Sequence, residues 1–508
     1  MRDQELDTPP TGTVIPEAAP EAMPEPAAAP EPEVPAAPVL RVSATVTMES
    51  NVFEPSRKEK VEPLYMVRVT LDELNKAAEA YPNINPASSE EGRNWVKAVS
   101  EALPLVLRGD VHLGSLKREG SDWRQSVDHE GLRLGAGKPM FGNNNDPTQR
   151  LTGERAIMRI QGLLGLGSVV QVPLWHTGIW VTIKAPSDGA LLNLERIIAE
   201  DKITLGRDAN GMIYSNASVY LNNHLFNFVI EHIYDTTLRD YSPEKFRSLV
   251  RSTDFPTLIW GLACAIYPTG YPVAQPCTLN PDVCQEVTSE HVMLPKLNWV
   301  DRQALTAHQK RHMANRNAKY TTEEIQKYMS EGRMADARPV DLTPNLRFAL
   351  QVPTIEQYVE SGDRWVTEII DMVSTAMGST LDEKNKDRFI MEHSRLSALR
   401  QYAHWVKRIV LLNEQGEEDG VVDDRETIEA TLNTISTDDE IVTKFLEAVK
   451  IYIDDSTVQM IALPSFNCPK CQAPMVDEER KHPLLIPLEP NMLFFTLRGR
   501  RLSRAKTH

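Results

Sequence analysis

The sequence predicts a mainly α-helical protein with a minor β component, an α+β arrangement of two helical modules, each followed by a cysteine hairpin, with a disordered N-terminal arm in front. Three observations support this prediction. Long segments of the second half carry apolar residues every three or four positions, as one face of a helix does. Residues 168–186 alternate in the manner of two strands joined by a turn. Two cysteine pairs each follow a helical block and precede an apolar strand.

The expected domain order has five parts. They are a disordered Pro/Ala/Glu-rich arm (1–40), a small α+β region with long loops (41–150), a first helical module with a strand hairpin and a cysteine pair (151–314), a linker (315–345), and a second helical module with a CxxC hairpin and a basic tail (346–508). The arm is expected to be disordered because such a composition buries too little apolar surface to offset the entropy of ordering.

In the first module, the strands of 168–186 are expected to turn at His176–Gly178, and residues 190–202 are expected to form a helix. Ser242 and Pro243 fit an N-cap followed by proline in the first turn of a helix. The apolar run from 255 to 272 is interrupted by prolines, which indicates a buried helix or hinge.

In the second module, helices are expected over 354–377, as one helix or a kinked pair, and over 384–412, 425–435 and 438–455. The last should begin with acids because the helix dipole favours negative charge there. The longest has one apolar stripe, made of Phe389, Leu396, Leu399, Ala403, Val406 and Val410.

Composition excludes several classes of protein. The net charge of −16 argues against a general nucleic-acid binder, which needs a basic face. No apolar run approaches the length of a membrane helix. The first residues have no basic stretch followed by an apolar one, so no signal peptide is expected. Five cysteines in 508 residues are too few for a disulfide framework, which favours a reducing compartment.

Four of these cysteines are candidate metal ligands: Cys277, Cys284, Cys468 and Cys471. They can form one four-sulfur zinc site between the modules, which we favour because it needs no unknown ligand. Alternatively, each pair binds its own ion with a histidine, His291 or His482, and one more group. The pairs can also be buried thiols without metal. A four-sulfur site leaves no open position for substrate, so any zinc is expected to be structural.

Other candidate residues have plainer interpretations. Cys264 lies in an apolar run and is expected to belong to the core. His308 and His312 share a helix face, but that face is charged, so solvated side chains are expected. His176 stands beside two tryptophans at a hairpin tip, which indicates a packed or partner-facing corner. No GxSxG turn marks a serine nucleophile. The arginines near residues 498–504 are expected to form a solvated end, or to contact an acidic neighbour.

The stretches VPLWHTGIWVTIKAPSDGALLNLER, LPKLNWVDRQALTAHQK and SFNCPKCQAPM resemble tailed-phage virion structural proteins. More narrowly, they are similar to the baseplate hub assembly proteins of T-even-like phages and their giant-phage relatives. The resemblance implies a non-enzymatic protein of the virion, or of the host cytoplasm during assembly. It implies other tail or baseplate proteins as partners, and neither nucleic acid nor membrane. The alternative is an intracellular enzyme or adaptor with an unidentified site in region 109–190.

Overall fold

The computed structural model describes residues 53–54, 63–65, 121–126, 169–205, 219–267, 270–276, 286–333, 336–377, 398–464, 470, 485–488 and 490–505. By its internal contacts the chain divides into Met1–Ser43 and Ala44–His508, and every described residue belongs to the second unit. The expected disordered arm (1–40) and most of the expected region 41–150 lie outside the described residues.

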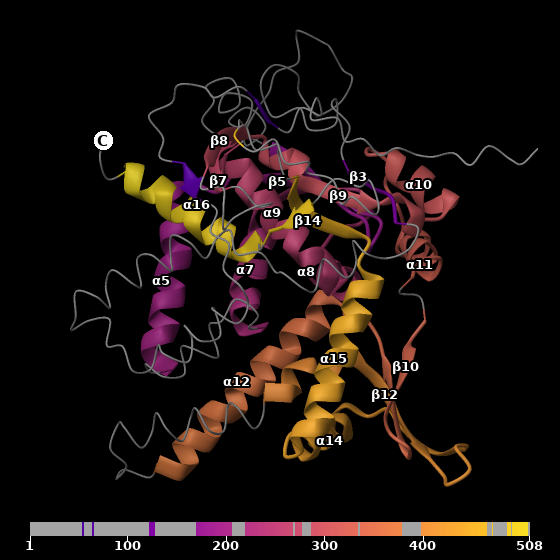
Figure 1. Ribbon diagram of the computed structural model, residues 1–508. Helices are drawn as coiled ribbons and strands as arrows, with labels where there is room; N and C mark the ends of the chain where they lie inside the picture. Colours follow the sequence, from indigo (N-terminus) through magenta and orange to yellow (C-terminus); the bar gives the residue numbers. More distant parts are fainter. Residues whose placement is uncertain are drawn as a thin grey trace, which may run out of the picture. The chain divides into compact units, whose positions relative to one another are not determined.

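The described part of the chain holds fifteen strands in four small sheets (Figure 1). One sheet has the order β1 (Phe53–Glu54), β8 (Val287–Val292), β7 (Tyr271–Pro276) and β2 (Leu64–Tyr65). Another has the order β15 (Leu485–Pro487), β14 (Gln459–Pro464), β9 (Asn298–Asp301) and β3 (Trp123–Gln125). A three-stranded sheet joins β4 (Val169–Leu174), β5 (Ile179–Lys184) and β6 (Ile233–Thr236). The fourth runs β10 (Arg338–Thr343), β11 (Leu346–Leu350), β12 (Val406–Leu412) and β13 (Glu418–Val422).

The expectation of a mainly α fold is therefore wrong, because the structure is mixed α/β. Most neighbouring strands pair antiparallel, whereas β2 pairs parallel to β7. Several of these strands are short apolar runs between helices. Periodicity alone does not separate such a buried strand from a helical segment, so the sequence pattern underestimated the β content.

The first core forms around the β4–β5–β6 sheet. The apolar run 255–272 contributes α9 (Phe255–Ile266), whose side chains are almost all buried and which packs on β4 and β5. Gly261 allows this close approach, since a Cβ there would lie 2.6 Å from Val172 Cγ2. This core also includes residues of α5 (Asp188–Leu205), α7 (Val219–Glu231), α8 (Pro243–Leu249) and α16 (Pro490–Ala505). As expected, Ser242 caps α8, with Pro243 in its first turn.

The second core lies between the β10–β13 sheet and two helices, α14 (Arg425–Ile435) and α15 (Asp439–Ser456). Both helices were expected, and Asp438 caps α15 by accepting from the backbone N–H groups of Glu440 and Ile441. A 3₁₀ segment, η6 (Ala398–Trp405), closes the core with Leu399 and Ala403.

The expected helix over 384–412 is wrong in its second half. Residues 398–405 form η6, and Val406–Leu412 is strand β12 in the middle of the sheet. Val406 and Val410 therefore do not continue a helical stripe. The run rich in β-branched residues packs between β11 and β13, where such side chains suit a pleated surface.

Helix α12 (Ile355–Met377) contacts both cores. Its apolar side chains, Ile355, Val359, Trp365, Val366 and Ile369, belong to the first core. Glu360, Arg364 and Glu368, at intervals of four, lie on another face and pair with groups from η6 and α14. The apolar face of α12 therefore packs in the first core, and its charged face pairs with η6 and α14, which belong to the second core.

The described ranges hold five further short helical elements. They are η3 (Ser252–Asp254), η4 (Leu294–Leu297), η5 (Arg302–Ala304), α10 (Ala307–Ala314) and α11 (Thr322–Ser330). The expected linker 315–345 contains α11 and β10. No helix in the described ranges combines the length and apolarity needed to cross a bilayer.

Candidate functional site

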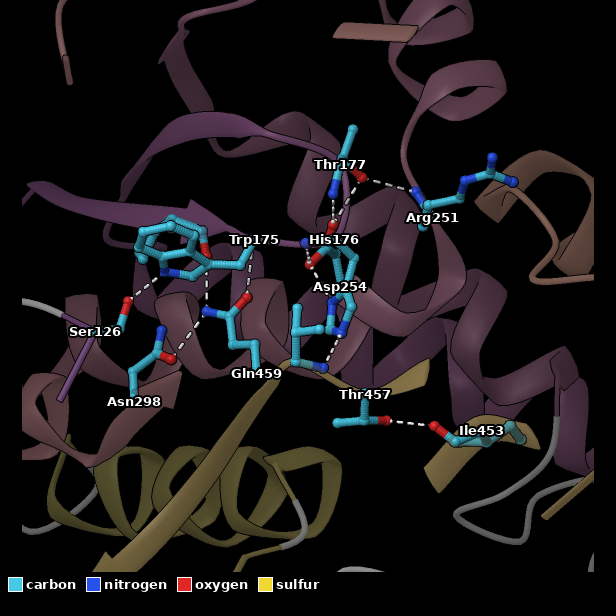
Figure 2. Close-up of polar contacts among 12 residues, drawn as sticks. Ser126, Trp175, His176, Thr177, Arg251, Asp254, Asn298, Ile453, Thr457 and Gln459 are labelled. Atoms are coloured by element: carbon cyan, nitrogen blue, oxygen red, sulfur yellow. Dashed lines mark hydrogen bonds and ion pairs between the residues drawn. The ribbon is translucent and has the colours of Figure 1, made fainter. Parts of the chain in front are cut away.

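The β4–β5 hairpin turns at Trp175–Gly178, as expected, and places two polar residues in the interior. His176 and Thr177 are both buried there. Gly178 has a φ of +89°, a conformation that glycine adopts without strain, and its N–H donates to the Leu174 carbonyl at 2.7 Å. The turn therefore directs His176 and Thr177 towards Asp254, where α9 begins (Figure 2).

The carboxylate of Asp254 is completely buried and accepts four hydrogen bonds. Its Oδ1 accepts from the backbone N–H of His176 at 3.2 Å and from the His176 ring at 2.8 Å. Its Oδ2 accepts from the N–H of Thr177 at 2.8 Å and from the Thr177 hydroxyl at 2.7 Å. Because Asp254 also stands at the N-terminus of α9, the helix dipole adds to these donors in stabilising the buried charge.

The bonds of His176 fix its tautomer. Its Nε2 accepts from the backbone N–H of Val458 at 3.0 Å, so the proton must be on Nδ1, which donates to Asp254. Both ring nitrogens are therefore engaged. A histidine between a carboxylate and a nucleophile is the arrangement of a catalytic triad, but here a backbone amide occupies the nucleophile's position. In this conformation Nε2 has no lone pair left with which to act as a general base.

We call Asp254, His176 and Thr177, with the backbone N–H groups of Arg251 and Val458, the Asp254 cluster. Arg251 N–H donates to the Thr177 hydroxyl at 3.0 Å, and the Arg251 guanidinium donates to the Val352 carbonyl at 2.7 Å. Burial lowers the pKa of Arg251. The cluster thus joins the hairpin turn, the start of α9 and the residue before β14.

A second set of bonds extends this connection to two further strands (Figure 2). Gln459 accepts from the N–H of Trp175 at 3.0 Å and donates to the Asn298 side chain at 2.8 Å. The Trp175 indole donates to the Ser126 hydroxyl at 2.6 Å. These residues come from four distant parts of the chain. Their hydrogen bonds therefore hold the β4–β5 turn, β14, β9 and the end of β3 together.

The cavity beside the Asp254 cluster is small. It measures about 20 Å³ and is lined in part by Trp175, His176, Arg251 and Arg333. A space of this size holds about one water molecule. It offers no room for a substrate of ordinary size in this conformation.

On the other side of the turn, Gly178 lies against an aromatic group. His312 donates from Nε2 to the Gly178 carbonyl at 2.8 Å and stacks on Tyr320, with ring centroids 3.7 Å apart. Burial lowers the pKa of His312, which favours its neutral form. The expectation that His312 is solvated is wrong, because the helix face it shares with His308 turns towards the hairpin. His308 is partly exposed and pairs with Glu331 at 3.0 Å.

A cluster of charges lies where α12 meets η6 and α14, and the sequence pattern did not reveal it. Arg400 pairs with Glu429 at 2.8 Å and also with Glu368. Arg364 pairs with Glu360 at 3.0 Å and with Glu429 at 3.4 Å. The i, i+4 spacing of acid and base on α12 was a usable local signal, but its partners come from elsewhere in the chain.

His404 is buried inside this charged cluster. Its Nε2 is 3.6 Å from the Glu360 carboxylate, too far for a hydrogen bond, and neither ring nitrogen has a hydrogen-bond partner among the described residues. Burial, followed by the charges of Arg425 and Arg364, lowers the pKa of His404 to about 3. The ring is therefore neutral in the folded protein at any pH near neutrality.

His404 should make stability depend on pH. Between pH 6.5 and about 3 the unfolded chain binds a proton that the folded chain excludes, so stability falls as the pH falls through this window. We expect His404→Leu to reduce the slope of the free energy of unfolding against pH in this window by up to about 1.4 kcal/mol per pH unit. Thermal melting across pH 4–8 measures this. Above pH 7.5 the two proteins should have parallel curves, and equal slopes below pH 6.5 would contradict the assignment.

The four candidate zinc ligands, Cys277, Cys284, Cys468 and Cys471, lie outside the described residues, as does His482. The strands on either side of each pair are described: Pro276 pairs with Val287, and Pro464 pairs with Leu485. Among the described residues, which do not include these four cysteines, no group of three potential ligands gathers. His291, the histidine after the first pair, is buried in β8. The zinc site stays a prediction.

Zinc removal tests that prediction directly. We expect Cys468→Ser to lower the melting temperature in the presence of zinc, because the loss of one thiolate opens a closed structural site. A chelator should lower the melting temperature of the parent towards that of the variant. Equal melting of parent and variant, with and without chelator, would rule out a structural zinc at Cys468.

Two further expectations concern the core and the C-terminal helix. Cys264 is buried in α9, where burial raises the pKa of its thiol well above the ordinary value, so its assignment to the core is confirmed. The solvated basic end is wrong for Arg501 and Arg500. They lie on α16, where Arg501 donates to Asp188 at 2.6 Å and Arg500 to the Pro63 carbonyl at 3.2 Å.

Comparison of this chain with protein-family models, with curated proteins and with solved structures finds no match.

Proposed function

We propose that this protein is a non-enzymatic structural or assembly component of a tailed-phage virion, acting in the tail or baseplate through contacts with other virion proteins. Its place of action would be the particle, or the host cytoplasm during assembly. The resemblance of its sequence to baseplate hub assembly proteins supports the proposal. The main observation behind it is that acidic and basic surface charge lie in separate segments of the chain.

Two segments of the chain carry opposite charge. Residues 406–456, which we call the acidic lobe, contain 14 Asp and Glu and 5 Lys and Arg, a net charge of −9. Residues 302–333, which we call the basic segment, contain 7 Lys and Arg and 3 Glu, a net charge of +4. All the acids of the lobe except Glu429 and Asp454 are exposed. Separated fields of this kind select and orient protein partners.

The alternative of an enzyme with a site in region 109–190 draws on His176, which lies in that region beside a buried carboxylate. In the described part of the region, the His176 ring is engaged at both nitrogens and the adjoining cavity is about 20 Å³. The ionisable groups nearby serve to fasten the fold. For this reason we favour contact over catalysis as the work of this chain.

The test is mass spectrometry with chemical cross-linking, applied to purified particles and tail-assembly intermediates of the phage that encodes this chain. We expect the chain at a fixed copy number in one of the two. Cross-links to a second tail component should involve the acidic lobe or the basic segment. Absence of the chain from both preparations would overturn the proposal.

A further inference from the structure

The sheet of the acidic lobe has two different edges. At one edge β10 contacts α15, Arg338 pairs with Asp455 of that helix, and Pro339 has no backbone N–H to offer another strand. At the other edge β13 pairs with β12 on its inner side, and no other strand of the described chain pairs with its outer side. In Figure 1 the hairpin that follows β12 extends away from the helices at the lower right. Within the described ranges, the backbone donors and acceptors on the outer side of β13 therefore have no strand partner.

The side chains of β13 and of its neighbour leave that edge accessible. On β13, Val421 is 48% exposed. On β12, Leu411, which pairs with Gly420 of β13, is 43% exposed. Open edges are usually protected by lysine, proline or a strong bulge. β13 has neither lysine nor proline, and its register shift lies at the turn end, so Gly420–Val422 pair regularly. An exposed, apolar and regular edge of this kind is suited to accept another strand.

Charge decides which strand fits. Glu414, Glu417, Glu418, Asp419, Asp423 and Asp424 flank the edge, and no lysine or arginine lies between Ile409 and Asp424. Antiparallel pairing of β13 with a second copy, with Gly420 opposite Val422, would put Asp419 opposite Asp423 and Glu418 opposite Asp424, which like-charge repulsion disfavours. The basic segment of a second copy is largely helical, in α10 and α11, and does not offer an extended strand.

On the basis of the proposed contact function, we propose that β13 is a docking edge for an extended segment of a partner protein in which apolar and basic side chains alternate. The segment adds to the sheet as a fifth strand beside β13. Its backbone pairs with Gly420–Val422. Its apolar side chains lie on the sheet face that holds Leu411 and Val422, and its basic side chains lie on the opposite face, which holds Asp419 and Val421. This is strand addition guided by charge.

A synthetic peptide of alternating lysine and valine is the probe, and its fully N-methylated copy is the first control. The copy keeps the charge and the side chains but has no N–H groups to donate. We expect calorimetry on the full-length protein to show binding of the parent peptide and at least about tenfold weaker binding of the N-methylated copy. Equal affinity of the two peptides would overturn the proposal, because it indicates attraction by charge alone.

Two matched variants locate the site. Asp419→Lys, on β13, and Glu447→Lys, on the exposed surface of α15, change the net charge of the lobe equally. We expect Asp419→Lys to weaken peptide binding about tenfold and Glu447→Lys by less than about twofold. Equal weakening by both, or no weakening by Asp419→Lys, contradicts docking at β13. Circular dichroism of each variant verifies that it is folded.

The two proposals fail separately. If the chain is found in particles but the peptide does not bind at β13, the docking edge is wrong and the assembly function stands. If the peptide binds as expected but the chain is absent from particles and intermediates, the virion function is wrong and the docking edge stands.

Discussion

Gly178→Ala is expected to destabilise the protein by about 3 kcal/mol or more, which combines two costs at one position. The φ of +89° strains any residue with a Cβ. The added Cβ would also lie 2.5 Å from Cδ1 of Tyr328, a fully buried ring. That ring cannot move freely, because its hydroxyl donates to the Trp175 carbonyl at 2.8 Å.

Two other glycines separate these costs. Gly416 has a φ of +79° but nothing within 4 Å of a new Cβ, so Gly416→Ala should cost only the backbone strain, about 1 kcal/mol. Gly261 has no positive φ but would meet Val172 at 2.6 Å, so Gly261→Ala should cost only the overpacking, about 1–3 kcal/mol. Thermal and urea unfolding, followed by circular dichroism, should rank Gly178→Ala as the most destabilised. Equal effects of Gly178→Ala and Gly416→Ala would contradict the contact with Tyr328.

The second large effect is expected at Asp254. Asp254→Ala should lower the free energy of unfolding by about 3–5 kcal/mol, because four donors of His176 and Thr177 lose their acceptor in the interior. Asp254→Asn should also lower the free energy of unfolding. The NH₂ group of the new amide is a donor, and it would face either the two donors of His176 or the N–H of Thr177. Asp235→Asn is the matched control: Asp235 is exposed and pairs with Lys319, so its effect should stay within about 1 kcal/mol.

A double-mutant cycle tests whether Asp254 and His176 act as one unit. His176→Ala alone removes the ring donor of Asp254 Oδ1, which keeps the backbone N–H of residue 176, and leaves the N–H of Val458 without its ring acceptor. The double variant His176→Ala, Asp254→Ala should therefore cost less than the sum of the two single variants, by about 1 kcal/mol or more. Additive effects would show that the two residues stabilise the fold independently. Denaturation midpoints of the four proteins give the answer.

Local sequence signals predicted a good part of the fold. The β4–β5 hairpin with its turn, the capped helix α8, the apolar helix α9, and α12, α14 and α15 were all expected from patterns within each segment. Such signals are complete in themselves, since a cap or an apolar stripe needs only its own residues. The pattern failed at 406–412, where a run that continues a helical stripe also suits a central strand. Only the neighbours β11 and β13 decide between the two.

The candidate site was only half visible in the sequence. His176 stood out because it lies at a turn between two tryptophans, and a packed corner was one of its expected roles. Asp254 was missed, although an acid directly before Phe-Pro is a signal for the start of a helix. No local pattern indicates that Asp254 meets His176, 78 positions away, or that Val458 approaches from 282 positions away.

By itself, the sequence determined the β4–β5 hairpin and the helices α8, α12, α14 and α15, that the chain is acidic, and that the apolar run 255–272 holds a buried helix. The tertiary structure alone decided that the fold is mixed α/β, that His312 is buried, and that no described strand pairs with the outer edge of β13. The physical reason is the range of the interactions. Periodicity and capping act within a few residues, whereas strand pairing and the burial of charge depend on groups that only the folded chain brings together.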